Sequence, residues 1–171
     1  RSIAVSPSGF VYVTGFFTNT VDFDPGPGVF TITSADGSCN SEIFILKLDV
    51  SGNFIWAKSV WALESICTSL TDEGFSIKLD NNENVYITGE FQGHADFNTS
   101  TLPADTFFVE ADGVSSITTD LFILKLNSSG NFKWVKTIGN VLYETGYGLH
   151  ISQAGNIFVT GLYSATTDFD P

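Results

Sequence analysis

The sequence predicts an all-β protein built from four-stranded antiparallel repeats, and three observations support this fold class. Aromatic residues make up 14% of the chain and charged residues only 15%, a composition that argues against disorder. Residues 44–58 and 122–136 share eleven of fifteen positions at an offset of 78. No stretch of the chain shows a sustained helical period. The chain is therefore expected to be a β-rich repeat protein.

A second repeated segment ends in a Thr-Gly pair and occurs three times. Its glycines are Gly15, Gly89 and Gly161, at offsets of 74 and 72. Each glycine is followed seven residues later by Asp-Phe-Asp-Pro or, in the second period, by Asp-Phe-Asn. Self-similarity at one fixed period is the sequence signature of repeat architectures.

Each period holds four strand candidates, joined in pairs by tight turns that contain Gly or Asn. In the second period these candidates are residues 75–80, 84–89, 121–127 and 131–137. We expect antiparallel pairing of residues 3–6 with 10–15, 43–49 with 53–60, and 121–127 with 131–137.

Four antiparallel strands per repeat describe a blade of a β-propeller. The chain would hold about two and a half blades of about 72–78 residues: residues 1–61, 62–137 and 138–171, all in one propeller. Because closed propellers have at least about four blades, the sequence predicts a fragment of a longer chain or a ring completed by further copies. A β-solenoid is the alternative, which the long period disfavours.

Several repeated side chains have structural interpretations. Trp56 and Trp134 occupy the same place on the fourth strand and are expected to pack between blades. The glycines of the Thr-Gly pairs are interpreted as strand ends. Four lysines repeat in phase and are interpreted as gatekeepers that protect edge strands: Lys47, Lys58, Lys125 and Lys136.

Three repeated segments resemble the bacterial SBBP family of β-propeller repeats. They are the strand that ends in Thr-Gly, the Asp-Phe-Asp-Pro-Gly loop, and the Phe-Ile-Leu-Lys-Leu segment that is followed by Ser-Gly-Asn and Trp. The resemblance implies a secreted or surface-exposed bacterial protein. It implies no particular activity, since that family shares no catalytic motif. The second period departs from the loop pattern, because Asn98-Thr99 replaces Asp-Pro.

Antiparallel strands place the tight turns at one end of the blades and the long connectors at the other. Long, structured loops on a rigid scaffold commonly carry function, so the long-loop face is the candidate ligand-binding face. Its candidate residues are Phe16, Phe17, Asp22, Asp24, Phe91, Asp96, Tyr163, Asp168 and Asp170.

The predicted function is a non-catalytic binding or adhesion module for a protein or a glycan. Further partners would be the rest of the propeller or other copies of the chain. The alternatives are a structural or assembly subunit and, less favoured, a propeller glycosidase or lyase fragment. The chain has two histidines, His94 and His150, and lacks the GxSxG, HExxH and P-loop motifs. A net charge of −12 disfavours nucleic acid, and no apolar run is long enough for membrane insertion.

Two chemical questions stay open at the level of the sequence. The repeated Asp-Phe-Asp-Pro loop is expected to be a turn in which Asp accepts backbone amides and Phe plugs the space beneath. The alternative is a Ca²⁺ site formed by Asp22 with Asp24 and by Asp168 with Asp170. Cys39 and Cys67 fit no zinc spacing, and we expect them to form a disulfide instead of two free thiols.

Overall fold

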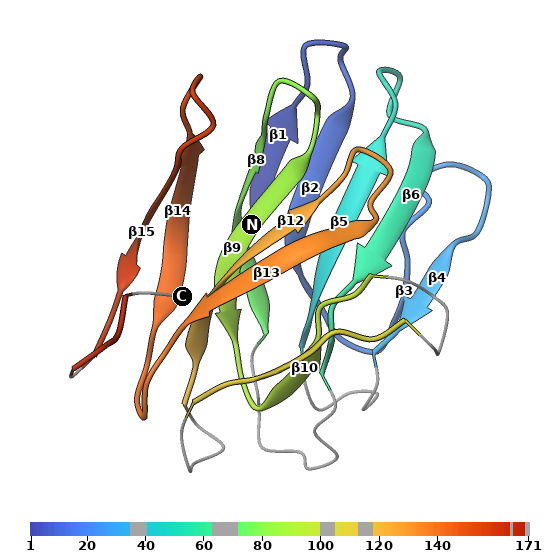
Figure 1. The fold of residues 1–171 in the computed structure, drawn as a ribbon. Helices are drawn as coiled ribbons and strands as arrows, with labels where there is room; N and C mark the ends of the chain where they lie inside the picture. Colours follow the sequence, from blue (N-terminus) through green and yellow to red (C-terminus); the bar gives the residue numbers. More distant parts are fainter. Residues whose placement is uncertain (35–40, 63–71, 100–104, 113–117, 165, 170–171) are drawn as a thin grey trace.

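The computed structural model describes residues 1–34, 41–62, 72–99, 105–112, 118–164 and 166–169. These residues form β-strands with turns and loops between them (Figure 1). Cys39, Cys67 and Asp170 lie outside the described residues, so the structure does not test the disulfide. A search of the described residues finds no helix of the length and hydrophobicity needed to cross a bilayer.

Among the described residues, two four-stranded antiparallel sheets and one two-stranded sheet form the blade-like units, and two smaller sheets lie in the long connectors. The first sheet has the order β1 (Ser2–Val5), β2 (Val11–Phe17), β5 (Glu42–Leu48) and β6 (Phe54–Ser59). The second has the order β8 (Glu73–Leu79), β9 (Val85–Phe91), β12 (Asp120–Leu126) and β13 (Phe132–Ile138). The third pairs β14 (Thr145–Ile151) with β15 (Ile157–Leu162). The three expected antiparallel pairings are confirmed.

The first side chain of each tight turn accepts backbone amides: an acid or amide begins three of the turns, and Ser6 and Ser152 begin two others. Asp49 Oδ1 accepts the amides of Ser51 and Asn53 at 2.8 and 2.9 Å. Asp80 and Asn127 accept the equivalent pairs of amides in their own turns. A side chain that caps the turn in this way fixes the strand register on both sides of it.

The long connectors contain short strands that the four-strand description missed. In the first, β3 (Thr20–Asp22) pairs with β4 (Thr31–Thr33). In the second, β10 (His94–Asp96) pairs with β11 (Phe108–Glu110) and also with β7 (Trp61–Ala62), which directly follows the first sheet. These strands have two or three residues each, too few to show an alternation of apolar and polar positions.

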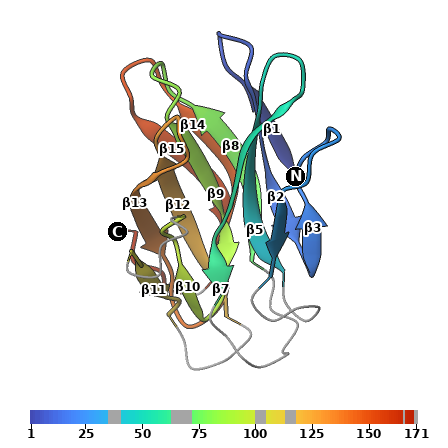
Figure 2. The ribbon, with the colours of Figure 1, turned by 90° about the vertical axis from the view of Figure 1, so that its right-hand side faces the viewer.

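The sheets stand side by side with their first strands in contact, β1 against β8 and β8 against β14. A buried apolar cluster fills the space between the first two sheets and includes Tyr12, Ile45, Ile87, Phe122 and Leu124. Figures 1 and 2 show the tight turns at one end and the long connectors at the other. This end-to-end separation agrees with the expectation from the sequence.

The glycines of the Thr-Gly pairs lie inside strands, and their interpretation as strand ends is wrong. The register shifts between Gly74 and Ser76 on β8, and this irregularity brings the backbone of β8 close to β9. A Cβ atom on Gly89 would lie 1.8 Å from the carbonyl oxygen of Glu73, and one on Gly161 would lie 2.0 Å from that of Thr145. Glycine is required because a neighbouring strand occupies the place of a side chain.

Two of the four repeated lysines are not on edge strands. Lys47 lies on β5 and Lys125 on β12, each an inner strand of its sheet. The Lys47 ammonium lies 4.9 Å from the centre of the Tyr12 ring and donates to the carbonyl oxygen of Ser128 in the second sheet. Lys125 lies over the Tyr86 ring in the same way. The gatekeeper interpretation is therefore wrong for Lys47 and Lys125, which make cation–π contacts within their sheets.

The packing role expected for Trp56 is confirmed. Its indole ring would lie 3.2 Å from a Cβ atom on Gly130, in the turn that follows β12 of the second sheet. It also packs against the core between the first two sheets. Trp134 meets the Tyr86 ring of its own sheet edge to face.

Candidate functional site

The Asp-Phe-Asp-Pro loop is held by its own carboxylates. Asp22 Oδ1 accepts the amides of Asp24 and Phe30, at 3.0 and 2.9 Å. Asp24 Oδ1 accepts the amide of Gly26 at 2.8 Å. Gly28 lies so close that a Cβ atom there would clash with Asp24 Oδ2. Asp22 thus joins the two arms of the β3–β4 hairpin across the loop.

The second period repeats this arrangement although its sequence departs from the pattern. Asp96 Oδ1 accepts the amides of Asn98 and Phe107, at 2.9 and 2.8 Å. The Asp-to-Asn change at position 98 leaves this pair of bonds in place, because both bonds depend on the first acid of the motif. The turn-forming role is thus present in both loops.

The phenylalanine of the motif is a plug beneath the loop in two of the three periods. Phe97 is fully buried, with ring centres 5.1 Å from Phe91 and 5.2 Å from Phe122. Phe23 is buried against the Phe17 ring. The expected plug is therefore confirmed in the first two periods. It is wrong in the third, where Phe169 is 59% exposed.

The structure divides the predicted face residues into accessible and inaccessible ones. Phe16 and Tyr163 are exposed, at 41% and 61%, and remain candidates for ligand contact. Phe17 and Phe91 are buried and cannot reach a ligand in this conformation, so their placement on the face is corrected. Both point under the loop hairpins, because a strand turns every second side chain inward. Of the predicted acids, Asp22 and Asp168 are exposed and Asp24 and Asp96 are partly buried.

Further exposed aromatic residues gather on the long connectors and were not singled out from the sequence. They are Phe30, Trp61, Phe107, Phe108 and Tyr143. Their location in connectors, outside the strand pattern, was the available signal. The Phe30 and Phe107 rings pack on Phe54 and Phe132, the first residues of β6 and β13, so these two connectors extend along the outer strands toward the tight turns.

The carboxylates of the predicted cation site already accept hydrogen bonds from the backbone of their own loop. Asp22 and Asp24 each use an oxygen to accept backbone amides. Among the residues that the structure describes, no three His, Cys, Asp or Glu side chains converge as metal ligands do. The calcium hypothesis stays a prediction, because the hydrogen-bonded oxygens retain further lone pairs.

Buried acids before the first strands form a second repeated feature that the sequence reasoning missed. Asp72 precedes β8 and accepts the amide of Gln92, just after β9, at 2.9 Å. Glu144 precedes β14 and accepts the amide of Ser164, just after β15, at 3.1 Å. Each acid thus ties the start of one strand to the end of its neighbour. Asp72 and Glu144 each lie two residues before a glycine and follow the offset of 72 between Gly89 and Gly161, which was the available signal.

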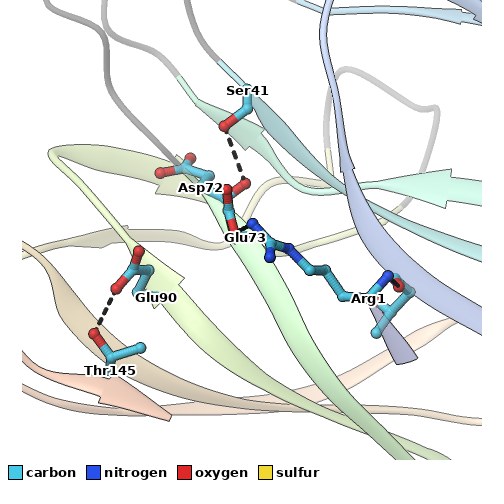
Figure 3. A network of polar contacts seen from close by, with 7 residues as sticks. Arg1, Ser41, Asp72, Glu73, Glu90 and Thr145 are labelled. Atoms are coloured by element: carbon cyan, nitrogen blue, oxygen red, sulfur yellow. Dashed lines mark hydrogen bonds and ion pairs between the residues drawn. The ribbon is translucent and has the colours of Figure 1, made fainter. Parts of the chain in front are cut away.

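Polar contacts also cross between the sheets (Figure 3). Arg1 donates to the carboxylate of Glu73 on β8, at 2.6 Å. Thr145 on β14 donates to the carboxylate of Glu90 on β9. Burial raises the pKa of Glu90, and the nearby Glu73 charge acts in the same direction. These contacts stabilise the packing of three sheets and contain no reactive pair.

Asp120, at the start of β12, is a buried acid with incomplete hydrogen bonding. Its Oδ2 accepts the amide of Asp112 at 2.9 Å, whereas its Oδ1 has no partner within the described residues. The carboxyl packs directly against Gly139. Burial raises the pKa of Asp120 to about 7, and the charges of Asp112 and Glu144 contribute to the rise.

The raised pKa of Asp120 predicts that the free energy of unfolding depends on pH. Between about pH 4 and pH 7 the folded protein keeps a proton on Asp120 that the unfolded chain releases, so the free energy of unfolding falls as the pH rises. We expect Asp120→Asn to flatten the fall between about pH 4 and pH 7 and to stabilise the protein at pH 8 by about 1–2 kcal/mol. Urea denaturation at several pH values measures this. The exposed Asp105→Asn is the control, and an equal slope in both variants would contradict the assignment.

Comparison with known proteins indicates the class of repeat protein to which this fold corresponds. No protein-family model matches the chain. The chain is similar to an uncharacterized WD repeat-containing protein of Acanthamoeba polyphaga mimivirus, with 31% identity over 155 residues. The match covers 86% of this chain and 10% of that protein, so the chain spans about a tenth of the length of this relative. Four-stranded antiparallel units and this similarity together define β-propeller-like repeats.

Proposed function

We propose that the chain is a non-catalytic binding module that takes its ligand at the end carrying the long connectors. The observation behind this proposal is that short hairpins, fixed by Asp22 and Asp96 and anchored by buried Phe23 and Phe97, hold exposed aromatic side chains in place. Aromatic side chains on rigid supports bind at low entropic cost. His94 and His150 each lie against a phenylalanine ring in different sheets, an arrangement that suits packing and not catalysis.

The proposal also includes the cellular location of the protein and the kind of ligand that it binds. The likeness to SBBP repeats supports a secreted or cell-surface protein of bacterial type that binds a protein or a glycan. The similarity to a WD repeat-containing protein supports an interaction role in general. An assembly role is a second candidate, because one blade-like unit is repeated along the chain, as in structural arrays. A sedimentation measurement separates the two, since polymers or rings indicate assembly and a monomer indicates a binding unit.

The binding function predicts that exposed aromatic residues at the long-loop end control affinity. The biotinylated chain is screened on an oligosaccharide array and against a random peptide library, and the best ligand is titrated. We expect the double variant Phe16→Ser, Tyr163→Ser to weaken binding at least about tenfold, since buried aromatic contacts dominate interfaces. Gln153→Ala, an exposed change at the tight-turn end, is the control and should bind normally. Equal loss in both variants would contradict the location.

The calcium hypothesis has its own test. If Asp22 and Asp24 bind Ca²⁺, millimolar calcium should raise the melting temperature and a chelator should reverse the rise. Asp24→Asn removes one of the two charges while keeping an oxygen that accepts the Gly26 amide, and it should abolish the calcium response. A melting temperature indifferent to calcium and chelator would leave the turn-forming role alone.

A further inference from the structure

A groove of ≈ 350 Å³ lies between the β3–β4 hairpin and the outer strand of the first sheet. Its walls are Phe30 with β4 on one side and residues 57–59 of β6 on the other. The exposed Trp61 also lines the groove, as does Thr99 of the second period. This groove was not part of the face identified from the sequence.

Both walls of the groove are strand edges. β4 pairs only with β3, and β6 pairs only with β5, within the part of the chain that the structure describes. The backbone N–H and C=O groups on their other sides take no part in a sheet there. Such edges pair readily with an added extended segment. An occupant with its own backbone donors and acceptors therefore fits the groove better than one without them.

Lys58 places a positive charge on the wall. Its side chain is half-buried, and burial lowers its pKa because the ammonium loses water. The described residues give it no ion-pair partner. A partly buried ammonium is most stable beside a carboxylate. The groove thus offers a place for one acidic group.

The second period has an acid at the position that corresponds to Thr33 on the groove wall. Lys136 faces Ile123 across its sheet as Lys58 faces Ile45, and Glu110 pairs with His94 as Thr33 pairs with Thr20. Glu110 of the second hairpin therefore occupies the position that Thr33 occupies in the first hairpin. Gly139 stands where the first period has Trp61. The first period lacks the acid and has an exposed aromatic ring instead.

We propose that this groove binds an extended peptide segment of a partner protein that carries one Asp or Glu side chain. Its main chain pairs with the edges of β4 and β6, its carboxylate accepts from Lys58 Nζ, and an adjacent apolar side chain packs on Trp61. The net charge of −12 disfavours a polyanion, so a single acid in a mostly uncharged segment is the best match. This inference rests on the proposed binding function and narrows its ligand to a protein.

The experiment selects a linear random peptide library on the intact chain and then titrates the consensus peptide by calorimetry. We expect enrichment of peptides with one Asp or Glu beside an aromatic or β-branched residue. Lys58→Gln should weaken the consensus peptide by about 10- to 100-fold, the usual value of a charge-assisted bond. Thr33→Glu, which introduces the acid of the second period, should weaken it similarly. Lys136→Gln is the matched control and should leave the affinity within about twofold.

The outcomes separate the groove from the wider function. Some peptides could bind equally to the wild type and to Lys58→Gln but not to the double variant Phe16→Ser, Tyr163→Ser. That result would contradict peptide binding in the groove and support the proposed binding function. Acidic oligosaccharides that need Lys58, with no enriched peptide, would replace the peptide by a glycan. Failure of every peptide and oligosaccharide to bind would overturn both proposals. Unchanged melting temperatures of the Lys58 and Thr33 variants show that any loss is local.

Discussion

Replacing Phe97 by alanine is expected to lower the free energy of unfolding by about 3–5 kcal/mol. The Phe97 ring is fully buried between the first two sheets and touches the rings of Phe91 and Phe122. Its removal leaves a cavity at the point where the loop hairpin meets both sheets. Urea denaturation followed by tryptophan fluorescence measures the change.

The repeat supplies a matched control for this substitution. Phe169 stands at the same motif position but is mostly exposed, so Phe169→Ala should cost less than about 0.5 kcal/mol. Phe23→Ala should fall between the two, since Phe23 is buried on the outer face of the first sheet. Equal costs at Phe97 and Phe169 would show that the motif stabilises by local turn formation and not by the plug.

Gly89→Ala is expected to cost about 3 kcal/mol, at the upper end of the usual range for overpacking. The new methyl group would lie 1.8 Å from the backbone oxygen of Glu73, and backbone cannot move aside as a flexible side chain does. The β8–β9 ladder would have to open near its bulge. Thermal unfolding and amide exchange on β8 and β9 both report this opening.

Gly15→Ala in the first period tests whether the cost of Gly89→Ala comes from the clash with the Glu73 backbone or from the loss of the repeated glycine itself. A Cβ atom there meets the Phe44 ring at 3.0 Å, a contact that a small shift of the ring relieves. We expect a cost of about 1 kcal/mol, clearly below that of Gly89→Ala. A larger effect at Gly15 than at Gly89 would contradict the role assigned to the bulge.

The strand pairing could be predicted from the sequence because the repeats align the same turns and apolar segments two or three times. The segment that begins at Phe44 and its copy at Phe122 form inner strands in the same register. The Asp-Phe-Asp-Pro loop was likewise interpretable, since an acid before a turn has a well-defined hydrogen-bonding role.

Other features depend on three-dimensional proximity, which a one-dimensional pattern does not contain. The role of Gly89 follows from a bulge in the neighbouring strand. The location of Lys47 on an inner strand follows from the order of strands in the sheet. The burial of Phe17 and Phe91 depends on which side of the strand the hairpin covers.

The candidate site was predicted in location and only partly in content. The end that carries the long connectors was inferred from the alternation of strand direction. The groove beside Lys58 could not be, because it forms between β4 and β6, and β4 was too short to be recognised. Comparing Thr33 with Glu110 becomes meaningful only once the two hairpins are known to share a register.

The pairing of β7 with β10 also determines where the chain can be cut for engineering. Trp61 and Ala62 follow the first sheet in sequence but hydrogen-bond to Asp96 and Ala95 in the hairpin of the next. A transplanted module that started at β8 would leave the edge of β10 bare and invite aggregation. A module that started at Trp61 would bring its own edge protection. The unit that can be recombined is therefore offset from the unit that the sequence repeats display.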